Sequence, residues 1–138
     1  MAGIIPNVAE ALAIGRLVNK TAQENLTLKL FKTNVTPGDA SVAGDFTEST
    51  FTGYAAITLI GANWVITTNS GSTPSQAAYA EQTFTSSAAQ TAELCYGYYI
   101  VGATSGTLHA AEKFATAQSI ANLNDKVFVT PVLTALGA

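Results

Sequence analysis

The sequence predicts an all-β protein, an antiparallel, jelly-roll-like β-sandwich with a short N-terminal helix or arm. Three observations predict this class: short apolar segments that alternate with a period of two, turn residues at short spacing, and one helical pattern at the start. The length of 138 residues is typical of one compact unit. We expect the arm and short helix to occupy residues 1–23 and the sandwich domain to occupy residues 24–138.

The N-terminal segment carries the helical pattern. Asn7 and Glu10 have the spacing of an N-cap with its reciprocal acceptor, and the residues that follow favour a helix from about Val8 to Val18. Gly15 weakens its middle. A helix this short is marginal alone, so it needs a docking surface, either its own sheet or a neighbouring chain.

From Glu24 the apolar period changes to two, which predicts a half-buried strand with one apolar face made of Leu26, Leu28 and Leu30. Residues 54–60 predict a second strand. Residues 64–68 predict its hairpin partner, with 61–63 as the connecting turn.

The C-terminal half predicts four further strands. Residues 78–85 form a weaker candidate, and residues 93–101 form a stronger one that is apolar or aromatic on both faces, which is typical of a central strand. Residues 107–114 and 127–130 follow, and Pro131 suits an edge or a bulge because it has no N–H. Seven or eight strands after one helix indicate an antiparallel sandwich or small barrel.

The charge content excludes several functions. Six Lys and Arg stand against nine Asp and Glu, and this net charge of −3 is opposite to what nucleic-acid binding requires. One Cys and one His can form neither an internal disulfide nor a Cys/His zinc site. Residues 49–80 carry no charge, but they hold too many Thr, Ser, Asn and Gly to span a membrane. The first residues lack the basic flank of a signal peptide, so we expect synthesis in the cytoplasm.

The sequence offers no catalytic, cofactor-binding or metal-binding residues, and we expect no enzyme activity. It has neither a glycine-rich phosphate loop nor a nucleophile elbow. His109 has no partner at a telling offset and is expected to be structural or part of an interface. Cys95 has apolar neighbours that raise a thiol pKa, so we expect it in the core. Three carboxylates are expected to be solvated at the surface: Glu81, Glu93 and Glu112.

The shortage of charge is the most informative feature. Charged residues make up 11% of the chain, against about 25% in a typical soluble domain. Surfaces that stay bound to a partner lose such residues because burying unpaired charge is costly. We therefore expect part of the surface to be permanently covered.

Several stretches resemble a known family. They are residues 28–37 (LKLFKTNVTP), 44–48 (GDFTE), 51–54 (FTGY), 96–101 (YGYYIV), 110–115 (AAEKFA) and 127–131 (VFVTP). Together they resemble capsid cement or decoration proteins of tailed double-stranded-DNA bacteriophages, of the Bordetella phage type, over roughly residues 26–136. These motifs are turns and core strands, and the family has no catalytic residues to carry over.

The resemblance implies a structural virion protein, made in the host cytoplasm, that binds the outer capsid surface and clamps neighbouring major capsid protein subunits together. Self-association as a homodimer or homotrimer is expected, because an open sandwich leaves edge strands that a second copy can cover. The N-terminal arm is the candidate anchor, to be buried either by a neighbouring subunit or by its own sheet; its apolar residues are Ile4, Ile5, Val8 and Leu12.

The alternative function is a carbohydrate- or receptor-binding module of a phage particle. Aromatic rings provide flat apolar area with a polar tip, as sugar-binding platforms do. The candidate platform consists of Trp64, Tyr96, Tyr98 and Tyr99, for which core packing is the competing interpretation.

Overall fold

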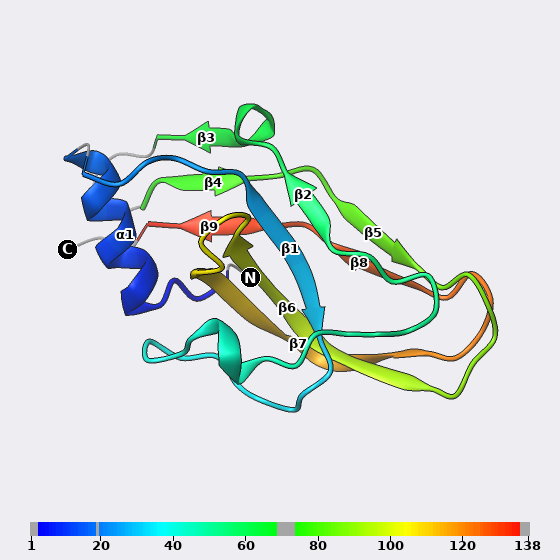
Figure 1. Ribbon diagram of the computed structural model, residues 1–138. Coiled ribbons are helices and arrows are strands. Elements are labelled where there is room, and N and C mark those ends of the chain that lie inside the picture. Colours follow the sequence, from blue (N-terminus) through cyan, green and yellow to red (C-terminus); the bar gives the residue numbers. More distant parts are fainter. Residues whose placement is uncertain (1–2, 19, 69–73, 136–138) are drawn as a thin grey trace.

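The computed structural model describes residues 3–18, 20–68 and 74–135, which form an antiparallel β-sandwich with one short α-helix (Figure 1). The elements are α1 (Asn7–Leu17), β1 (Leu26–Phe31), β2 (Ile57–Leu59), β3 (Val65–Thr67), β4 (Gln76–Ala78), β5 (Gln82–Thr85), β6 (Glu93–Gly102), β7 (Leu108–Ile120), β8 (Lys126–Val129) and β9 (Val132–Thr134). The predicted fold class, an all-β sandwich with a short N-terminal helix, is confirmed.

The first layer is a four-stranded sheet in the order β2-β1-β6-β7. Both predictions for this layer are confirmed: β1 turns Leu28 and Leu30 into the core, and β6 lies between two neighbours as a central strand. Opposite the single residue Tyr96 of β6, β7 has four residues, 114–117, between the pairs Gly97–Lys113 and Cys95–Gln118. This bulge bends β7, as Figure 1 shows.

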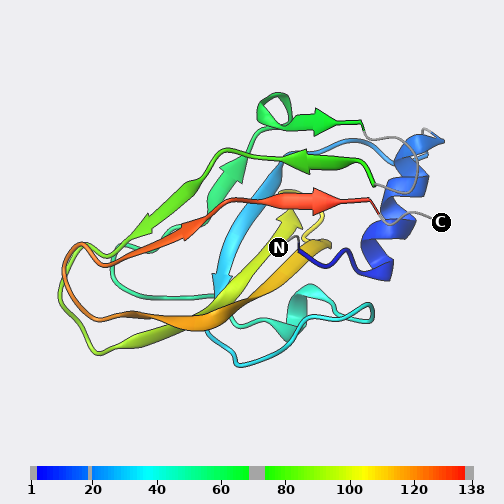
Figure 2. The same ribbon diagram turned by 180° about the vertical axis from the view of Figure 1, so that it is seen from behind.

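The second layer consists of a three-stranded sheet, β3-β4-β9, and a two-stranded ribbon, β5-β8. Strands β4 and β5 follow one another along one line, as do β8 and β9 (Figure 2). Both lines are interrupted at the same point. There Tyr79, between β4 and β5, donates its N–H to the carbonyl of Pro131, between β8 and β9, at 2.9 Å. The predicted strand 78–85 is therefore two strands, and β9 is one that the sequence analysis missed.

The predicted hairpin between residues 54–60 and 64–68 is wrong. Strand β2 pairs with β1, and β3 pairs with β4 in the other layer. Between them the chain turns through a 3-10 helix, Gly61–Asn63. The Tyr79 hydroxyl accepts hydrogen bonds from the Ile60 N–H at 3.1 Å and from Asn63 Nδ2 at 3.2 Å, which stabilises the crossing between layers.

The main core lies between the four-stranded sheet and the β5-β8 ribbon. Its buried side chains come from both layers and include Leu28, Leu59, Phe84, Ile100, Ile120 and Val127. This burial explains why the strands alternate between apolar and polar residues.

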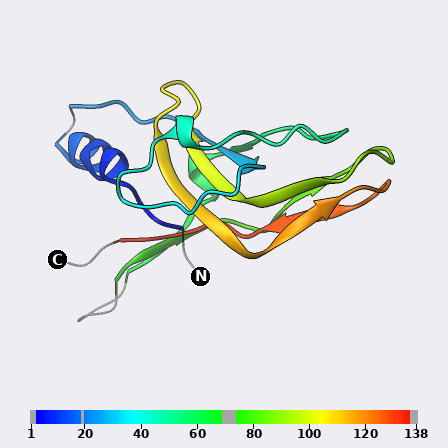
Figure 3. The same cartoon turned by 90° about the horizontal axis from the view of Figure 1, so that it is seen from below.

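A second apolar cluster covers the outer face of the four-stranded sheet. The segment between β1 and β2 crosses this face (Figure 3), and its Phe46 ring stacks on Tyr99 with centroids 5.2 Å apart. The centroid of the Phe31 ring lies 4.9 Å from that of the Phe46 ring. The apolar side chains on the outer face of β6 are therefore covered by the β1–β2 segment and not by a third sheet.

The predicted cap of the helix is wrong. The N-cap is Pro6, no side chain caps the helix, and the Pro6 carbonyl accepts the N–H groups of Ala9 and Glu10. The Asn7 N–H donates instead to the Asp39 carbonyl at 3.0 Å. This contact with the β1–β2 segment starts the helix one residue earlier than expected.

Candidate interaction surfaces

The N-terminal arm lies on the protein's own sheets. The Gly3 N–H donates to the Val132 carbonyl at 3.2 Å, and Ile4 and Ala111 exchange two backbone hydrogen bonds of 2.8 and 3.0 Å. Gly3 therefore pairs with β9 and Ile4 with β7. The arm connects the two layers where their edges meet.

This arrangement leaves the four predicted anchor residues with different degrees of burial. Ile5 and Leu12 are half-buried, whereas Ile4 and Val8 remain exposed. Of the two alternatives for the arm, the structure shows packing on its own sheets. Two of its side chains stay accessible to a partner.

Helix α1 packs against β7 and buries Ala9. Its C-terminal part turns large apolar side chains outward, which are Ile14, Leu17 and Val18. Leu17 is 86% exposed, so this end of the helix contributes little to the core.

A polar cluster fixes the exposed end of the helix to the sandwich. Arg16 Nη1 donates to His109 Nε2 at 3.0 Å, and Arg16 Nη2 donates to Glu24 Oε1 at 3.3 Å. Because arginine can only donate, His109 Nε2 is an acceptor, and its Nδ1–H donates to the Thr107 carbonyl at 2.9 Å. Burial and the Arg16 charge lower the pKa of His109. His109 therefore has a structural role here.

Glu24 connects this cluster to the β6–β7 turn. Its carboxylate accepts hydrogen bonds from the Ser105 hydroxyl and from the N–H groups of Ser105 and Thr104. Chiefly because of the Ser105 bonds, the pKa of Glu24 falls to about 2. The Glu24 carboxylate is thus ionised at neutral and at mildly acidic pH.

The β3-β4-β9 sheet is thinly covered. Val65 and Ile66 of the edge strand β3 are each 66% exposed. Exposed edges are usually protected by charged residues, but residues 49–80 contain none. One face of the sheet borders an apolar hollow of about 280 Å³, lined in part by Ile5, Ile66 and Leu133.

The exposed parts of α1 and β3 lie at the same end of the molecule (Figures 1 and 3). We call the set Ile14, Leu17, Val18, Val65 and Ile66 the apolar end. The sequence analysis missed these residues as a group. Apolar surface of this kind binds a protein partner by being removed from water.

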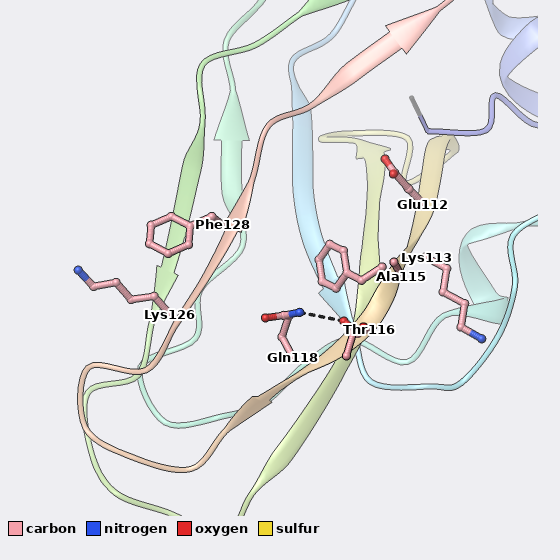
Figure 4. Close-up of a pocket in the computed structure, with 8 residues that line it drawn as sticks. Glu112, Lys113, Ala115, Thr116, Gln118, Lys126 and Phe128 are labelled. Carbon is pink, nitrogen blue, oxygen red and sulfur yellow. Dashed lines mark hydrogen bonds between the residues drawn. The ribbon is translucent and has the colours of Figure 1, made fainter. Parts of the chain in front are cut away.

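A second surface is the β7–β8 groove, a hollow of about 580 Å³ between the edges of the two layers (Figure 4). Its lining residues are Glu112, Lys113, Phe114, Ala115, Thr116, Gln118, Lys126 and Phe128. Phe128 is 55% exposed. The groove runs along β7 at the bulge, where the pairing of β7 with β6 is interrupted.

Two of the three carboxylates expected to be solvated at the surface are half-buried and hydrogen-bonded. Glu81 is exposed, but Glu93 accepts hydrogen bonds from the N–H groups of Thr50 and Phe51 and from Lys32. Although burial opposes it, the bonds from Thr50 and Lys32 lower the pKa of Glu93.

Glu112 accepts the Tyr98 hydroxyl at 2.9 Å. Like Glu93, it holds a neighbouring segment in place. The sequence could not show this, because each partner lies at least fourteen residues away along the chain.

Cys95 is buried as predicted. Its thiol lies 3.4 Å from the Ser49 hydroxyl, and burial raises its pKa, which keeps it in the unreactive thiol form.

The proposed aromatic platform is not assembled. Tyr98 and Tyr99 are buried on opposite faces of β6, in the main core and in the outer cluster. Tyr96 packs against the outer cluster, whereas Trp64 packs against the main core, with its ring 5.1 Å from that of Tyr79. These four residues therefore share no single surface.

Among the described residues, no group of three or more His, Cys, Asp or Glu side chains is placed to hold a metal ion. In the same part of the chain, no helix has the length and apolarity needed to cross a membrane.

Neither a known protein family nor a curated protein matches the sequence. The resemblance to phage decoration proteins therefore stays a prediction.

Proposed function

We propose that the protein is a decoration protein that binds the outer surface of a phage capsid and clamps neighbouring major capsid protein subunits together. The observation that carries the proposal is the apolar end, where two separate elements, α1 and β3, expose large apolar side chains. The motif resemblance supplies the identity of the partner.

The mechanism is thermodynamic. A domain that bridges two subunits must be released before they separate, so its binding free energy adds to the stability of the assembled shell. A standard protein interface buries about 1,600 Å². Because every copy on a lattice makes the same contacts, moderate affinity at each one gives a persistent coat.

The partly buried polar cluster of Arg16, Glu24 and His109 supports a rigid clamp. Arg16 and Glu24 fix α1 to the β6–β7 turn, so the exposed side chains of the helix are held in place before binding. Pre-organisation of this kind lowers the entropy lost on association.

The test is co-sedimentation of the purified protein with empty mature shells. We expect the wild-type protein to bind and to raise the temperature at which the shells come apart. Leu17→Glu and Val65→Glu should each weaken binding by about tenfold or more, because each places a charge in the interface. Leu123→Glu is the matched control, since Leu123 is 58% exposed and lies in the β7–β8 turn, at the other end of the molecule.

Failure of the wild-type protein to co-sediment would reject the capsid proposal. Equal binding by all three variants would show that the apolar end is not the contact surface.

Self-association belongs to the same proposal. Strand β3 is an uncovered edge that a second copy can extend into a dimer or trimer. Light scattering on the wild-type protein and on Val65→Glu tests this, because the variant should shift any oligomer towards the monomer.

A further inference from the structure

Helix α1 is attached to the sandwich differently at its two ends. At its start, the Asn7 N–H donates to the Asp39 carbonyl at 3.0 Å, Ala9 is buried, and the arm before it pairs with β7 and β9. In the C-terminal part of α1, residues 13–18, every residue is exposed except Gly15 and Arg16, which are half-buried. This part of the helix therefore buries little apolar surface against the sheet.

Arg16 provides every side-chain hydrogen bond of the C-terminal part of α1, because it is the only polar residue there. Its Nη1 donates to Nε2 of His109 at 3.0 Å, and its Nη2 donates to Glu24 Oε1 at 3.3 Å. Its Nε donates to the Ala22 carbonyl at 3.4 Å. Ala22 and Glu24 belong to the segment between α1 and β1, so His109 is the partner that lies on a strand of the sandwich.

The hydrogen bond between Arg16 and His109 requires a neutral imidazole. The Thr107 carbonyl can only accept, so it fixes the ring proton on Nδ1, and Nε2 is left to accept from Arg16. A second proton would bind at Nε2, directly opposite the Nη1 donor. Two donors and two positive charges would then face each other, so protonation of His109 and this hydrogen bond exclude one another.

Two charged groups of the described residues act on the His109 ring, and they come from different elements. Arg16 of α1 opposes protonation, and Glu24, before β1, favours it more weakly. Burial opposes protonation most strongly, whereas the bond to the Thr107 carbonyl favours it, and the net effect is a lowered pKa. Glu24 keeps its charge in mild acid because its pKa is about 2. His109 is therefore the member of this cluster whose charge changes first on acidification.

We propose that Arg16 and His109 form an acid-sensitive contact, in which protonation of His109 breaks the bond to Arg16 and releases the C-terminal part of α1 from the sandwich. Arg16 then keeps its bond to Glu24, but at 3.3 Å this bond is longer than the roughly 2.7–2.9 Å of a strong charge-assisted bond. The start of α1 keeps its own backbone contacts.

The contact controls part of the apolar end. Ile14, Leu17 and Val18 are held in a fixed position at neutral pH and lose that position in mild acid, whereas Val65 and Ile66 of β3 are unaffected. This inference does not rest on the proposed capsid role.

The size of the effect follows from the midpoint of His109. The released ring titrates at its ordinary value of 6.5 and the docked ring below it, so the released state binds the proton more tightly. Release therefore increases as pH falls through 6.5 and levels off below the midpoint of the docked ring. A docked midpoint one pH unit below 6.5 corresponds to about a tenfold increase in release.

Amide exchange measured by NMR tests the proposal. The wild-type protein is compared at about pH 8, where the imidazole is neutral, and at a pH about one unit below the His109 midpoint given by its imidazole signals. After correction for the intrinsic pH dependence of exchange, protection in the C-terminal part of α1 should fall by the factor that the midpoint sets. The amides of Ile4 and Ala111, which bond to each other's carbonyls, should keep their protection as an internal reference.

Two variants identify the groups responsible. His109→Gln is the matched control, because its side chain does not titrate and its Oε1 can still accept from Arg16. Protection in the C-terminal part of α1 should then be equal at the two pH values. Arg16→Met removes the donor and its charge, so protection there should be low at both pH values and the His109 midpoint should rise.

Unchanged protection in the wild-type protein across the His109 midpoint would overturn the proposal. An equal loss in His109→Gln would place the titrating group elsewhere, and a pH dependence that survives Arg16→Met would show that this contact is not the cause; either result would also overturn it. So would an equal loss at Ile4 and Ala111, because it would indicate global unfolding instead of local release.

Discussion

The four-stranded sheet and the β3-β4-β9 sheet contain similar residue types but cover them very differently. Ile100 of β6 is fully buried, with core side chains on one side of its sheet and the β1–β2 segment on the other. Ile66 of β3 is 66% exposed. The comparison teaches that apolar β-forming residues predict a strand, whereas the layers around the strand decide whether those residues stabilise the fold or remain free for a partner.

The largest expected difference comes from the same substitution in both sheets. Ile100→Ala should reduce the free energy of unfolding by about 2–5 kcal/mol, because it removes buried atoms and leaves a cavity. Ile66→Ala should change it by no more than about 0.5 kcal/mol. Urea unfolding followed by Trp64 fluorescence measures both. Equal losses would contradict the difference in coverage.

A glycine pair sharpens the comparison within the first sheet and its loop. A Cβ at Gly97 would overlap the backbone oxygen of Glu112 and the Phe31 ring, whereas a Cβ at Gly44 meets nothing within 4 Å. Gly97→Ala should therefore destabilise the protein by about 1–3 kcal/mol through overpacking, and Gly44→Ala should not. Thermal unfolding of the two variants checks this, and a stable Gly97→Ala would show that both the β7 backbone at Glu112 and the Phe31 ring can move aside.

A substitution at Glu93 tests how much its hydrogen bonds stabilise the β1–β2 segment on the four-stranded sheet. Glu93→Gln weakens charge-assisted bonds to Thr50, Phe51 and Lys32 and should cost about 1 kcal/mol. Because the folded pKa of Glu93 is lowered from 4.5, its contribution is present above pH 4.5 and is lost as pH falls through the folded value. The variant should lose less stability than the wild type on acidification. An identical pH dependence would contradict this role.

The smallest effect is expected at the junction between the helix and the four-stranded sheet. His109 is the one histidine of the chain, so its imidazole NMR signals report a single group. Burial and Arg16 should place its midpoint below the usual 6.5. The neutral form is favoured in the fold, so stability is fully present above pH 6.5 and decreases as pH falls below it. A midpoint at or above 6.5 would contradict the burial of this ring beside Arg16.

Much of the candidate surface was beyond sequence analysis. The low charge content predicted a covered surface without locating it, and the sequence did not show that Ile14, Leu17 and Val18 would stay exposed. Whether such a face is buried depends on how the helix is oriented on β7. That orientation is set by Arg16 with His109, a partner 93 residues away.

The sequence alone determined part of the local structure. The alternation of Leu26, Leu28 and Leu30 predicted β1, and the residues on both faces of 93–101 predicted a central strand, because these patterns depend on neighbours a few residues apart. Only the tertiary structure decided that β2 and β3 belong to different layers, and that the arm pairs with both β7 and β9. Those features depend on contacts between segments far apart in the chain, whose geometry no local pattern encodes.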